Sequence, residues 1–371
     1  MTSLSRSWVE IDLRAIANNA RNITQRVGKD RKWLAAVKAD GYGHGAIPVA
    51  KTAAEHGASL LAVASMEEAL ALRDAGIAQD ILILSHCPTA LVPVAVREEL
   101  ILSVFDLATL QRYEMAIVAG ETLSVHLKID TGMGRMGVLP EQALPVLQAL
   151  VRSDKLLAQG IYTHFASAAE EDEFTSQQIE SLKRVLATAT EIGLTFSWIH
   201  AANSAGLLGH GPQFGNLFRV GIALYGLEPT NSAPLLRGFQ PALRWKTRVA
   251  QVKNLPAGHS VGYGRTYLTD RPERIAILPV GYADGYRRAP AAPQYVLWKG
   301  ERCPIIGRIS MEKTTVAVPD GLRVEPEDEV VLLGRQGEAQ ISAETVAAWL
   351  GTINYEVVTA ISARLPRFYL D

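Results

Sequence analysis

Residues 33–45 read WLAAVKADGYGHG and show the pattern on which the fold prediction rests. The apolar run at the start of this stretch predicts a buried β-strand, and Lys38 follows directly at its end. Glycines then alternate with Tyr42 and His44, which predicts a turn because glycine adopts backbone conformations that other residues avoid. The ammonium group of Lys38 is therefore predicted to lie where a buried strand meets a glycine-rich turn.

The same unit, a short apolar run and then an amphipathic helical pattern, recurs as far as about residue 225. Alternating strands and helices form parallel sheets, and about eight such units favour a (β/α)₈ TIM-like barrel, with an open doubly wound sheet as the alternative. The predicted strands are 33–37, 60–64, 81–84, 100–104, 123–129, 157–163, 196–201 and 217–224. The clearest predicted helices are Met66–Ala75, Leu107–Ala119, Glu141–Val151 and Ser176–Ile192.

The pattern changes after Gly238, where short β-rich runs lie between glycines and prolines and only Ala343–Leu350 is predicted to be helical. We therefore predict two domains in this α/β chain. Residues 1–238 form the barrel, and residues 239–371 form a C-terminal, mainly β domain. The first ten or so residues are candidate strand partners of that second domain.

Composition favours a globular protein that acts on small molecules. Of 371 residues, 48% are hydrophobic, which is ample for a large core, and the formal net charge of -1 gives no attraction to nucleic acid or to a membrane surface. The two cysteines lack metal-ligand spacing, so no metal site is predicted. The N-terminus lacks the pattern of a secretory signal, which predicts a cytoplasmic location.

Polar residues stand at or near the ends of five predicted strands. The carboxyl ends of barrel strands open at one mouth, where the active sites of this architecture lie. A lysine held among apolar residues loses its charge readily, and a neutral amine condenses with aldehydes. These residues are Lys38, Lys128 with Asp130, His164, Asn203 with Ser204, and Arg219.

Each residue also has a simpler interpretation. Lys38 could extend its ammonium group to solvent at the barrel rim, and Lys128 could form a salt bridge with Asp130. His164 could be an ordinary hydrogen-bonded core histidine, which is also how we interpret His44, His126 and His200.

Gly132–Gly137 reads GMGRMG and matches the dinucleotide-binding pattern G-x-G-x-x-G. That fingerprint requires an acidic residue at the end of the next strand, whereas the nearest candidate, Asp154, precedes it. We therefore reject a dinucleotide site here.

A better anion site follows the seventh and eighth strands, where barrel enzymes hold phosphate groups on backbone N–H donors. Asn203-Ser204-Ala205-Gly206 and Gly221-Ile222 lie there, although helix capping by Ser204 is an alternative. A phosphate site opposite a desolvated lysine indicates a phosphorylated aldehyde, and pyridoxal 5'-phosphate satisfies both requirements.

Nine motifs, in this order and across essentially the whole chain, resemble those of the alanine racemases, a pyridoxal-phosphate barrel family of fold type III. They are AVKADGYGHG (36–45), HLKIDTGMGRMG (126–137), YTHFASA (162–168), HAANSAG (200–206), FRVGIALYG (218–226), VGYGRTY (261–267), PVGYADGY (279–286), GRISME (307–312) and INYEVV (353–358).

The resemblance implies a homodimer with shared active sites that interconverts L-alanine and D-alanine and supplies D-alanine for peptidoglycan. Lys38 and a Tyr263 from the other subunit would be the two bases, assisted by His164 and Arg219, and Lys128 would be a candidate for carbamylation. The implied cofactor-binding residues are Lys38, Tyr42, Arg135, His164, Asn203, Ser204, Arg219, Gly221, Ile222 and Tyr355, and the implied substrate-binding residues are Arg135, Met311 and Tyr282.

The chemistry agrees with these implied roles. Racemisation removes a proton from one face of a planar carbon and delivers one to the other, so two bases on opposite sides are needed. Arginine does not give up its proton, so Arg219 would leave the cofactor's pyridine nitrogen unprotonated and would restrain side reactions.

The sequence departs from the family pattern at Gly262, where serine is usual, at Glu312, where aspartate is common, and at Ala168 and Ala169, where an acidic residue often stands. These departures leave open a broad-specificity racemase of serine or basic amino acids. A decarboxylase of related fold and a cofactor carrier without turnover are more distant alternatives. Cys303 lacks the motif of the decarboxylases, and the C-terminal domain with Tyr263 argues against a carrier.

Overall fold

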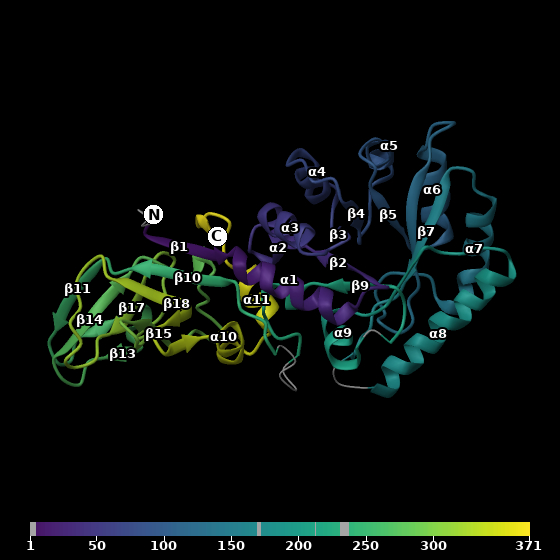
Figure 1. The fold of residues 1–371 in the computed structure, drawn as a ribbon. Coiled ribbons are helices and arrows are strands. Elements are labelled where there is room, and N and C mark those ends of the chain that lie inside the picture. Colours follow the sequence, from purple (N-terminus) through teal and green to yellow (C-terminus); the bar gives the residue numbers. More distant parts are fainter. Residues whose placement is uncertain (1–4, 169–171, 212, 231–236) are drawn as a thin grey trace. The chain divides into compact units, whose positions relative to one another are not determined.

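The computed structural model describes residues 5–168, 172–211, 213–230 and 237–371, so Ala169 lies outside the described residues. The chain divides into two compact units (Figure 1). The barrel unit comprises Ala15–Gly41 and Gly45–Gln240, and the β unit comprises Met1–Arg14, Tyr42–His44 and Pro241–Asp371.

Eight parallel strands form the sheet of the barrel unit in the order β8-β7-β6-β5-β4-β3-β2-β9. The end strands β8 and β9 lie in contact, so the sheet nearly closes on a core that includes Leu34, Leu82 and Leu217. The predicted barrel-like sheet is confirmed. Its strands are β2 (Lys32–Ala36), β3 (Leu60–Val63), β4 (Asp80–Ile83), β5 (Ile101–Val104), β6 (Leu123–Lys128), β7 (Leu156–Tyr162), β8 (Trp198–His200) and β9 (Leu217–Val220).

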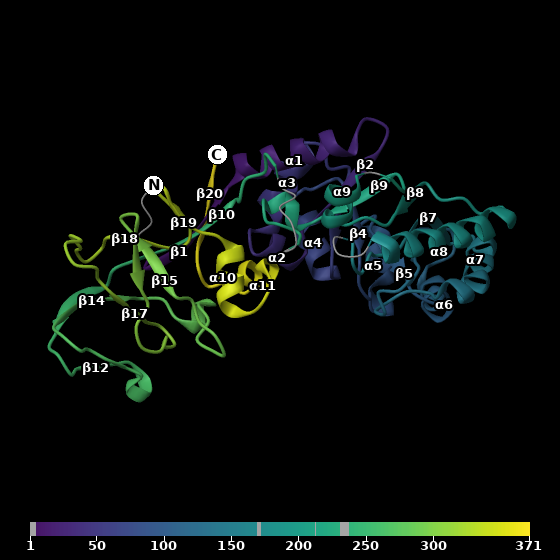
Figure 2. The same ribbon diagram turned by 90° about the horizontal axis from the view of Figure 1, so that it is seen from below.

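Helices that connect these strands lie around the outside of the sheet (Figures 1 and 2). Polar caps fix where two of them begin, because Ser65 accepts the Glu68 N–H and Asp106 accepts the Thr109 N–H. The helices are α1 (Leu13–Val27), α2 (Lys38–Tyr42), α3 (Ala46–Glu55), α4 (Met66–Asp74), α5 (Val92–Arg97), α6 (Leu107–Ala116), α7 (Ala143–Arg152), α8 (Asp172–Glu191) and α9 (Ser204–His210). All four predicted crossover helices are present among them.

The eighth strand is shorter than predicted. The apolar run 217–224 suggested one strand, but β9 ends at Val220 and a short 3-10 helix, η3 (Ile222–Tyr225), follows. Gly221 breaks the strand with φ -111° and ψ -94°, outside the extended region. Every residue of η3 is buried, which explains why hydrophobicity alone could not separate the two elements.

The β unit contains a seven-stranded sheet in the order β16-β15-β18-β10-β1-β20, with β19 paired to β18. Within it, β1 (Ser7–Asp12) pairs antiparallel with β10 and parallel with β20. A three-stranded sheet has the order β11-β14-β17, and β12 pairs with β13 at one extremity of the unit (Figure 2). The remaining strands are β10 (Leu243–Arg248), β11 (Gln251–Leu255), β12 (Ser260–Val261), β13 (Tyr267–Leu268), β14 (Glu273–Leu278), β15 (Tyr295–Trp298), β16 (Glu301–Pro304), β17 (Thr314–Ala317), β18 (Glu329–Gln336), β19 (Ala339–Ile341) and β20 (Arg367–Leu370).

Two helices interrupt these strands. The predicted helix is present as α10 (Ala343–Leu350), which begins at a Ser342 cap and ends where Gly351 turns left-handed. A second helix, α11 (Asn354–Thr359), was not predicted because it has only six residues, three of them β-branched. No helix in the described ranges has the length and apolar character needed to cross a bilayer.

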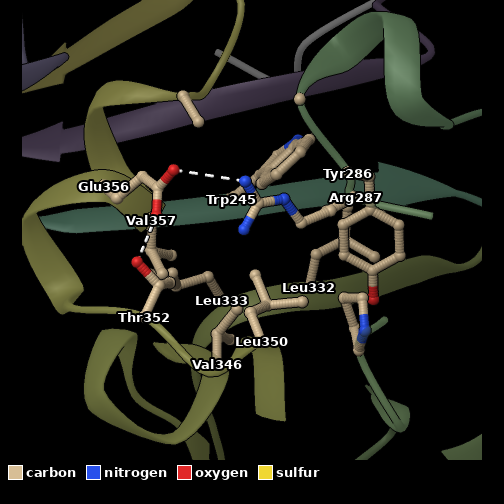
Figure 3. A pocket seen from close by; sticks show the side chains of 13 residues that line it. Trp245, Tyr286, Arg287, Leu332, Leu333, Val346, Leu350, Thr352, Glu356 and Val357 are labelled. Carbon is tan, nitrogen blue, oxygen red and sulfur yellow. Dashed lines mark hydrogen bonds and ion pairs between the residues drawn. The ribbon is translucent and has the colours of Figure 1, made fainter. Parts of the chain in front are cut away.

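A small, mainly apolar cavity of about 50 Å³ lies within the β unit (Figure 3). The Arg287 guanidinium pairs with Glu356 at 3.2 Å on its lining, and Thr352 donates a hydrogen bond to the same carboxylate. The cavity therefore combines an apolar wall with a small polar cluster. Its lining includes Trp245, Tyr286, Leu332, Leu333, Val346, Leu350 and Val357.

Candidate active site

Lys38 lies just beyond β2 and begins α2, which is a strained left-handed turn and not a regular helix. Ala39 and Asp40 have φ of 53° and 51°, a left-handed conformation that is costly for non-glycine residues. Glu68 holds the turn because its carboxylate accepts the Ala39 N–H at 2.7 Å and the Ala64 N–H at 2.7 Å. Burial, and then the positive field of Arg135, lowers the pKa of Lys38, while Glu68 opposes this shift. Lys38 therefore loses its proton more readily than an ordinary lysine does.

Arg219 is 5% exposed and is hydrogen-bonded through neutral partners only among the described contacts. It donates to the carbonyl oxygens of Thr163 and Ala201, each at 2.8 Å. It also lies 3.0 Å from Nδ1 of His164 and 3.0 Å from Nδ1 of His200. Burial lowers the pKa of Arg219 to about 10, so it stays a cation at neutral pH.

Both histidines beside Arg219 must accept hydrogen bonds from its guanidinium group, because guanidinium only donates. Burial, and then the charge of Arg219, lowers the pKa of His164 and of His200 well below 6.5, so both rings are neutral with the proton on Nε2. The Nε2 of His200 lies 2.9 Å from Nδ1 of His126, and its ring stacks on Tyr162 at a centroid distance of 4.6 Å. These contacts fix the orientation of the His200 ring, and the ring in turn helps to fix the orientation of the Arg219 guanidinium.

Lys128 adds a further cation to the barrel unit. Its Nζ lies 5.6 Å from the centroid of the Tyr162 ring, and the guanidinium carbon of Arg219 lies 5.3 Å from the same centroid. Burial, followed by the charges of Arg135 and Arg219, lowers the pKa of Lys128 to about 8. Arg135 and Arg219 thus lower the pKa of both Lys38 and Lys128, although Glu68 and Asp130 oppose this shift, and the surplus of positive groups favours a ligand that brings negative charge.

The salt bridge considered between Lys128 and Asp130 is not present. The Asp130 carboxylate instead accepts the backbone N–H groups of residues 132–135 at 2.9 to 3.1 Å. Burial raises the pKa of Asp130, but hydrogen bonds from these N–H groups outweigh burial, so the pKa is lowered overall. The GMGRMG stretch is thus a loop wrapped around a carboxylate, and this loop carries Arg135.

Ser204 links the seventh and eighth strand ends. Its hydroxyl oxygen accepts the backbone N–H of Gly221 at 3.2 Å and of Ala223 at 3.4 Å. The residue that caps α9 is Asn203, whose Oδ1 accepts the Gly206 N–H at 2.9 Å, so the alternative of capping by Ser204 was wrong. Asn203, Ser204, Gly221 and Ile222 therefore lie together at one end of the barrel sheet.

In the β unit, Tyr42 lies near Tyr355, with ring centroids 6.1 Å apart. Arg367 ties this segment to the C-terminal strand by donating to the Gly43 carbonyl oxygen at 3.0 Å. Burial raises the pKa of Tyr42 to about 12 and also raises that of Tyr355. Both phenols therefore remain protonated hydrogen-bond donors.

Three further predicted residues are large and exposed side chains of the β unit. Tyr263, in the short helix η4 (Tyr263–Arg265), is 67% exposed. Tyr282, in η5 (Tyr282–Asp284), is 43% exposed, and Met311 is 55% exposed. Tyr282 N–H donates to the Ser310 carbonyl oxygen at 3.1 Å, so the segments that carry Tyr282 and Met311 lie side by side.

Comparison with known proteins identifies the family. Residues 11–229 match the alanine racemase N-terminal domain, and residues 242–369 match the alanine racemase C-terminal domain. The chain belongs to the alanine racemase family. It is 44% identical over 367 residues to an alanine racemase of Symbiobacterium thermophilum, covering 98% of this chain and 97% of that one. It is 40% identical to alanine racemase 2 of Bacillus subtilis, covering 98% of this chain and 94% of that one.

Solved structures of the family have the same fold. An alanine racemase from Bacillus anthracis with bound L-Ala-P superposes with a TM-score of 0.93 at 37% identity, covering all of this chain and 96% of that one. One from E. faecalis gives a TM-score of 0.93 at 37% identity, covering 98% of each chain. Membership of this family makes the protein an isomerase.

The pairing of two buried residues that accompany Arg219 was missed by sequence reasoning. His126 and His200 are hydrogen-bonded core histidines, as interpreted from the sequence, but the sequence did not predict that they form a pair that ends on Arg219. The alternation of β6 gave a signal, since His126 and Lys128 share one strand face. No group of three or more His, Cys, Asp or Glu side chains in the described part of the chain could hold a metal ion.

Proposed function

We propose that this enzyme interconverts L-alanine and D-alanine with pyridoxal 5'-phosphate, using Lys38 and Tyr263 as its two bases. The observation that carries the proposal is the hydrogen bonding of Arg219. A buried cation with only neutral described partners, beside a lysine of lowered pKa, suits an aldehyde cofactor with a neutral ring nitrogen. The named activity of the relatives supports the choice of alanine.

The residues of the barrel unit fit this cofactor chemically. The positive charges of Arg135 and Arg219 suit its phosphate and phenolate groups, and the buried Ser204–Gly221 link suits a phosphate site. We assign Lys38 to the aldehyde, Arg219 to the ring nitrogen and Arg135 to the phenolic oxygen or the substrate carboxylate. Phosphate binding falls to Tyr42, Asn203, Ser204, Gly221, Ile222 and Tyr355.

Proton transfer then depends on two side chains of the protein. The bound cofactor supplies an electron sink that acidifies the substrate's α C–H bond. In the D-to-L direction, the Lys38 amine accepts the α-proton of D-alanine and Tyr263 delivers a proton to the opposite face of the same carbon. In the L-to-D direction, Tyr263 accepts the α-proton of L-alanine and Lys38 delivers a proton to the face opposite to it. His164 contacts Arg219 and would extend the hydrogen-bonded chain to Tyr263. Arg219 keeps the ring nitrogen unprotonated because guanidinium only donates.

We also propose a homodimer in which Tyr263, Met311 and Tyr282 complete the site of the partner. Their exposure supports this, since large exposed hydrophobic side chains in one region mark interaction surfaces. Met311 and Tyr282 would then contact the substrate. We place the enzyme in the cytoplasm as a source of D-alanine for peptidoglycan. The free, buried thiols of Cys87 and Cys303 suit a reducing compartment.

The test is an absorbance spectrum of the purified protein followed by chiral assays with alanine, serine, lysine and arginine. We expect a yellow protein that racemises alanine with the highest kcat/KM. Preference for serine or a basic amino acid would replace alanine with the broad-specificity alternative. Absence of turnover on all four substrates would refute the proposed function.

Lys38→Ala tests the cofactor attachment separately. Reduction with borohydride should fix the cofactor to the unmodified chain and leave the variant without a covalent adduct. Lys32→Ala is the control, because Lys32 is an exposed lysine at the other end of the same strand. A reducible adduct in the Lys38→Ala variant would assign the aldehyde to another lysine.

A further inference from the structure

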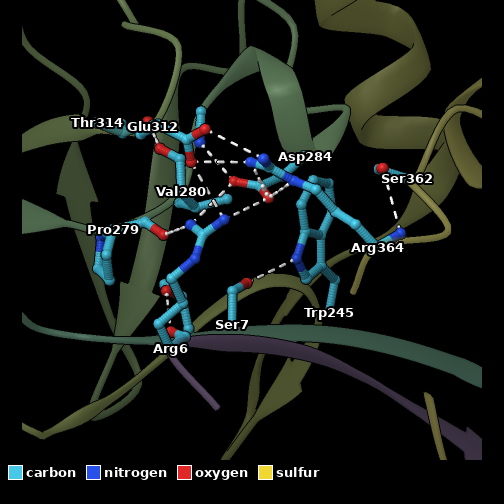
Figure 4. A network of polar contacts seen from close by, with 12 residues as sticks. Arg6, Ser7, Trp245, Pro279, Val280, Asp284, Glu312, Thr314, Ser362 and Arg364 are labelled. Atoms are coloured by element: carbon cyan, nitrogen blue, oxygen red, sulfur yellow. Dashed lines mark hydrogen bonds and ion pairs between the residues drawn. The ribbon is translucent and has the colours of Figure 1, made fainter. Parts of the chain in front are cut away.

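Two arginines and two carboxylates form a closed ion cluster in the β unit (Figure 4). Arg6 pairs with Asp284 at 2.9 Å and with Glu312 at 3.2 Å. Arg364 pairs with Asp284 at 2.6 Å and with Glu312 at 2.8 Å. Each arginine thus contacts both carboxylates, and the formal charges of the four side chains cancel.

Asp284 is the buried centre of this cluster, with a side chain that is 0% exposed. Its Oδ2 accepts the Gly281 N–H at 3.1 Å, so the carboxylate also closes the turn around η5. Arg364 donates to its Oδ1 through Nε at 2.8 Å. A buried charge is costly to leave unpaired, so the turn that carries Tyr282 is held to both arginines.

Glu312 connects the cluster to the neighbouring segment. Arg364 donates to its two oxygens at 3.1 and 2.8 Å, a forked geometry that fixes direction as well as distance. Hydrogen bonds from Arg364 lower the pKa of Glu312, which keeps the carboxylate charged at neutral pH. The residue directly before it is Met311, so the fork limits where Met311 can lie.

Backbone hydrogen bonds join the segment that carries Tyr282 to the segment that carries Met311. Besides the bond from Tyr282 to Ser310, the Ala283 N–H donates to the Met311 carbonyl oxygen at 3.1 Å. A side chain at Gly281 would place its Cβ 2.2 Å from the Ser310 carbonyl oxygen, so only glycine permits this approach. Tyr282 and Met311 are therefore presented as one surface with a fixed spacing.

We propose that the Arg6–Asp284–Glu312–Arg364 cluster positions Tyr282 and Met311 and thereby sets the preference for alanine over larger amino acids. This inference rests on the proposed function. Glu312 and Arg364 act as positioning residues, because they act through their neighbours and not on the reacting atoms. The longer side chain of Glu312, in place of the aspartate expected from the family pattern, reaches both arginines.

Glu312→Gln tests the proposal, because Glu312 is 47% exposed and its loss should leave the chain folded. We expect KM for L-alanine to rise with kcat nearly unchanged, and the ratio of kcat/KM for alanine to that for serine to fall by about tenfold. Glu312→Asp, which keeps the charge, should recover part of the ratio. Arg364→Lys should resemble Glu312→Gln, because lysine cannot form the fork.

Asp320→Asn is the matched control. It removes a carboxylate from an exposed arginine pair in the same unit, with Arg271 at 3.5 Å, and should leave the ratio unchanged. An unchanged ratio in Glu312→Gln, or an equal change in the control, would overturn the positioning role while the parent enzyme still racemises alanine. A parent enzyme without alanine turnover would refute the proposed function and this inference with it.

Discussion

The guanidinium carbon of Arg288 lies 5.6 Å from the centroid of the Tyr263 ring. The same side chain donates to the Ile309 carbonyl oxygen at 2.8 Å, which anchors it to the segment that leads to Met311. A cation over an aromatic face attracts the ring and limits its rotation. Arg288 therefore orients an otherwise exposed phenol.

Arg288→Gln should reduce kcat in both directions by about 2- to 5-fold, since an exposed cation–π contact contributes about 0.5–1 kcal/mol. Initial rates from L- and D-alanine would measure the effect. Arg302→Gln is a matched control, because the Arg302 guanidinium carbon lies 4.8 Å from the Tyr295 ring centroid in the same unit. Equal losses in the two variants would show a general effect of removing an arginine.

Tyr263→Phe should keep the yellow absorbance and lose racemisation by about 10²- to 10⁴-fold, the usual contribution of a general base. The defect should be larger for proton abstraction from L-alanine than from D-alanine. Exchange of the α-hydrogen in deuterated solvent separates the two abstraction steps. Tyr267→Phe controls for loss of a nearby phenol oxygen, which here donates to Glu273 at 2.8 Å. Full turnover by Tyr263→Phe would remove the phenol from the mechanism.

Mixing Lys38→Ala subunits with Tyr263→Phe subunits tests whether active sites are shared. If each site takes Lys38 from one chain and Tyr263 from the other, a mixed dimer regains one intact site. Random association makes half of the dimers mixed, so activity should recover to about one quarter of the unmodified level. Dissociation and reassociation before the assay would provide the measurement. If both residues act within one chain, no activity will return.

The sequence was most informative where chemistry and periodicity coincide. The apolar runs marked all eight parallel strands, because buried strands of such a sheet are apolar on both faces. The same argument failed at Gly221, where the buried residues of η3 look like a continued strand. The His126–His200 pair was missed because a core histidine and a positioning histidine have identical local sequence patterns. Only the tertiary contact with Arg219 distinguishes them.

Lys128 should make stability depend on pH. Its pKa is about 8 in the folded chain against 10.5 for an ordinary lysine, so between these values the unfolded chain binds more protons. Stability without the cofactor should therefore rise as pH increases from about 8 towards 10. Lys38, whose pKa is also lowered, contributes with the same sign.

Urea midpoints of the cofactor-free protein in bicarbonate-free buffer would measure this dependence. The urea midpoint of Lys128→Gln should depend less on pH than that of the unmodified chain. The midpoint of Lys32→Gln, an exposed substitution in the same unit, should depend on pH as strongly as that of the unmodified chain. Adding bicarbonate should raise the midpoint at pH 8 only where Lys128 is present, because a carbamate would replace a repelled cation with an anion. Identical pH profiles for Lys128→Gln and the unmodified chain would contradict the assigned shift.

The cavity of the β unit offers a test of packing that is independent of catalysis. Val346 is 6% exposed and lines this cavity of about 50 Å³, so Val346→Ile adds one methylene group to apolar space. The free energy of unfolding should rise by up to about 0.8 kcal/mol, the value of one buried methylene. Val316→Ile makes the same chemical change at a 0% exposed residue of β17 outside the cavity lining and should destabilise by overpacking. Urea unfolding followed by tryptophan fluorescence would compare the two variants, and a lower midpoint for Val346→Ile would show that the cavity lacks room for the added group.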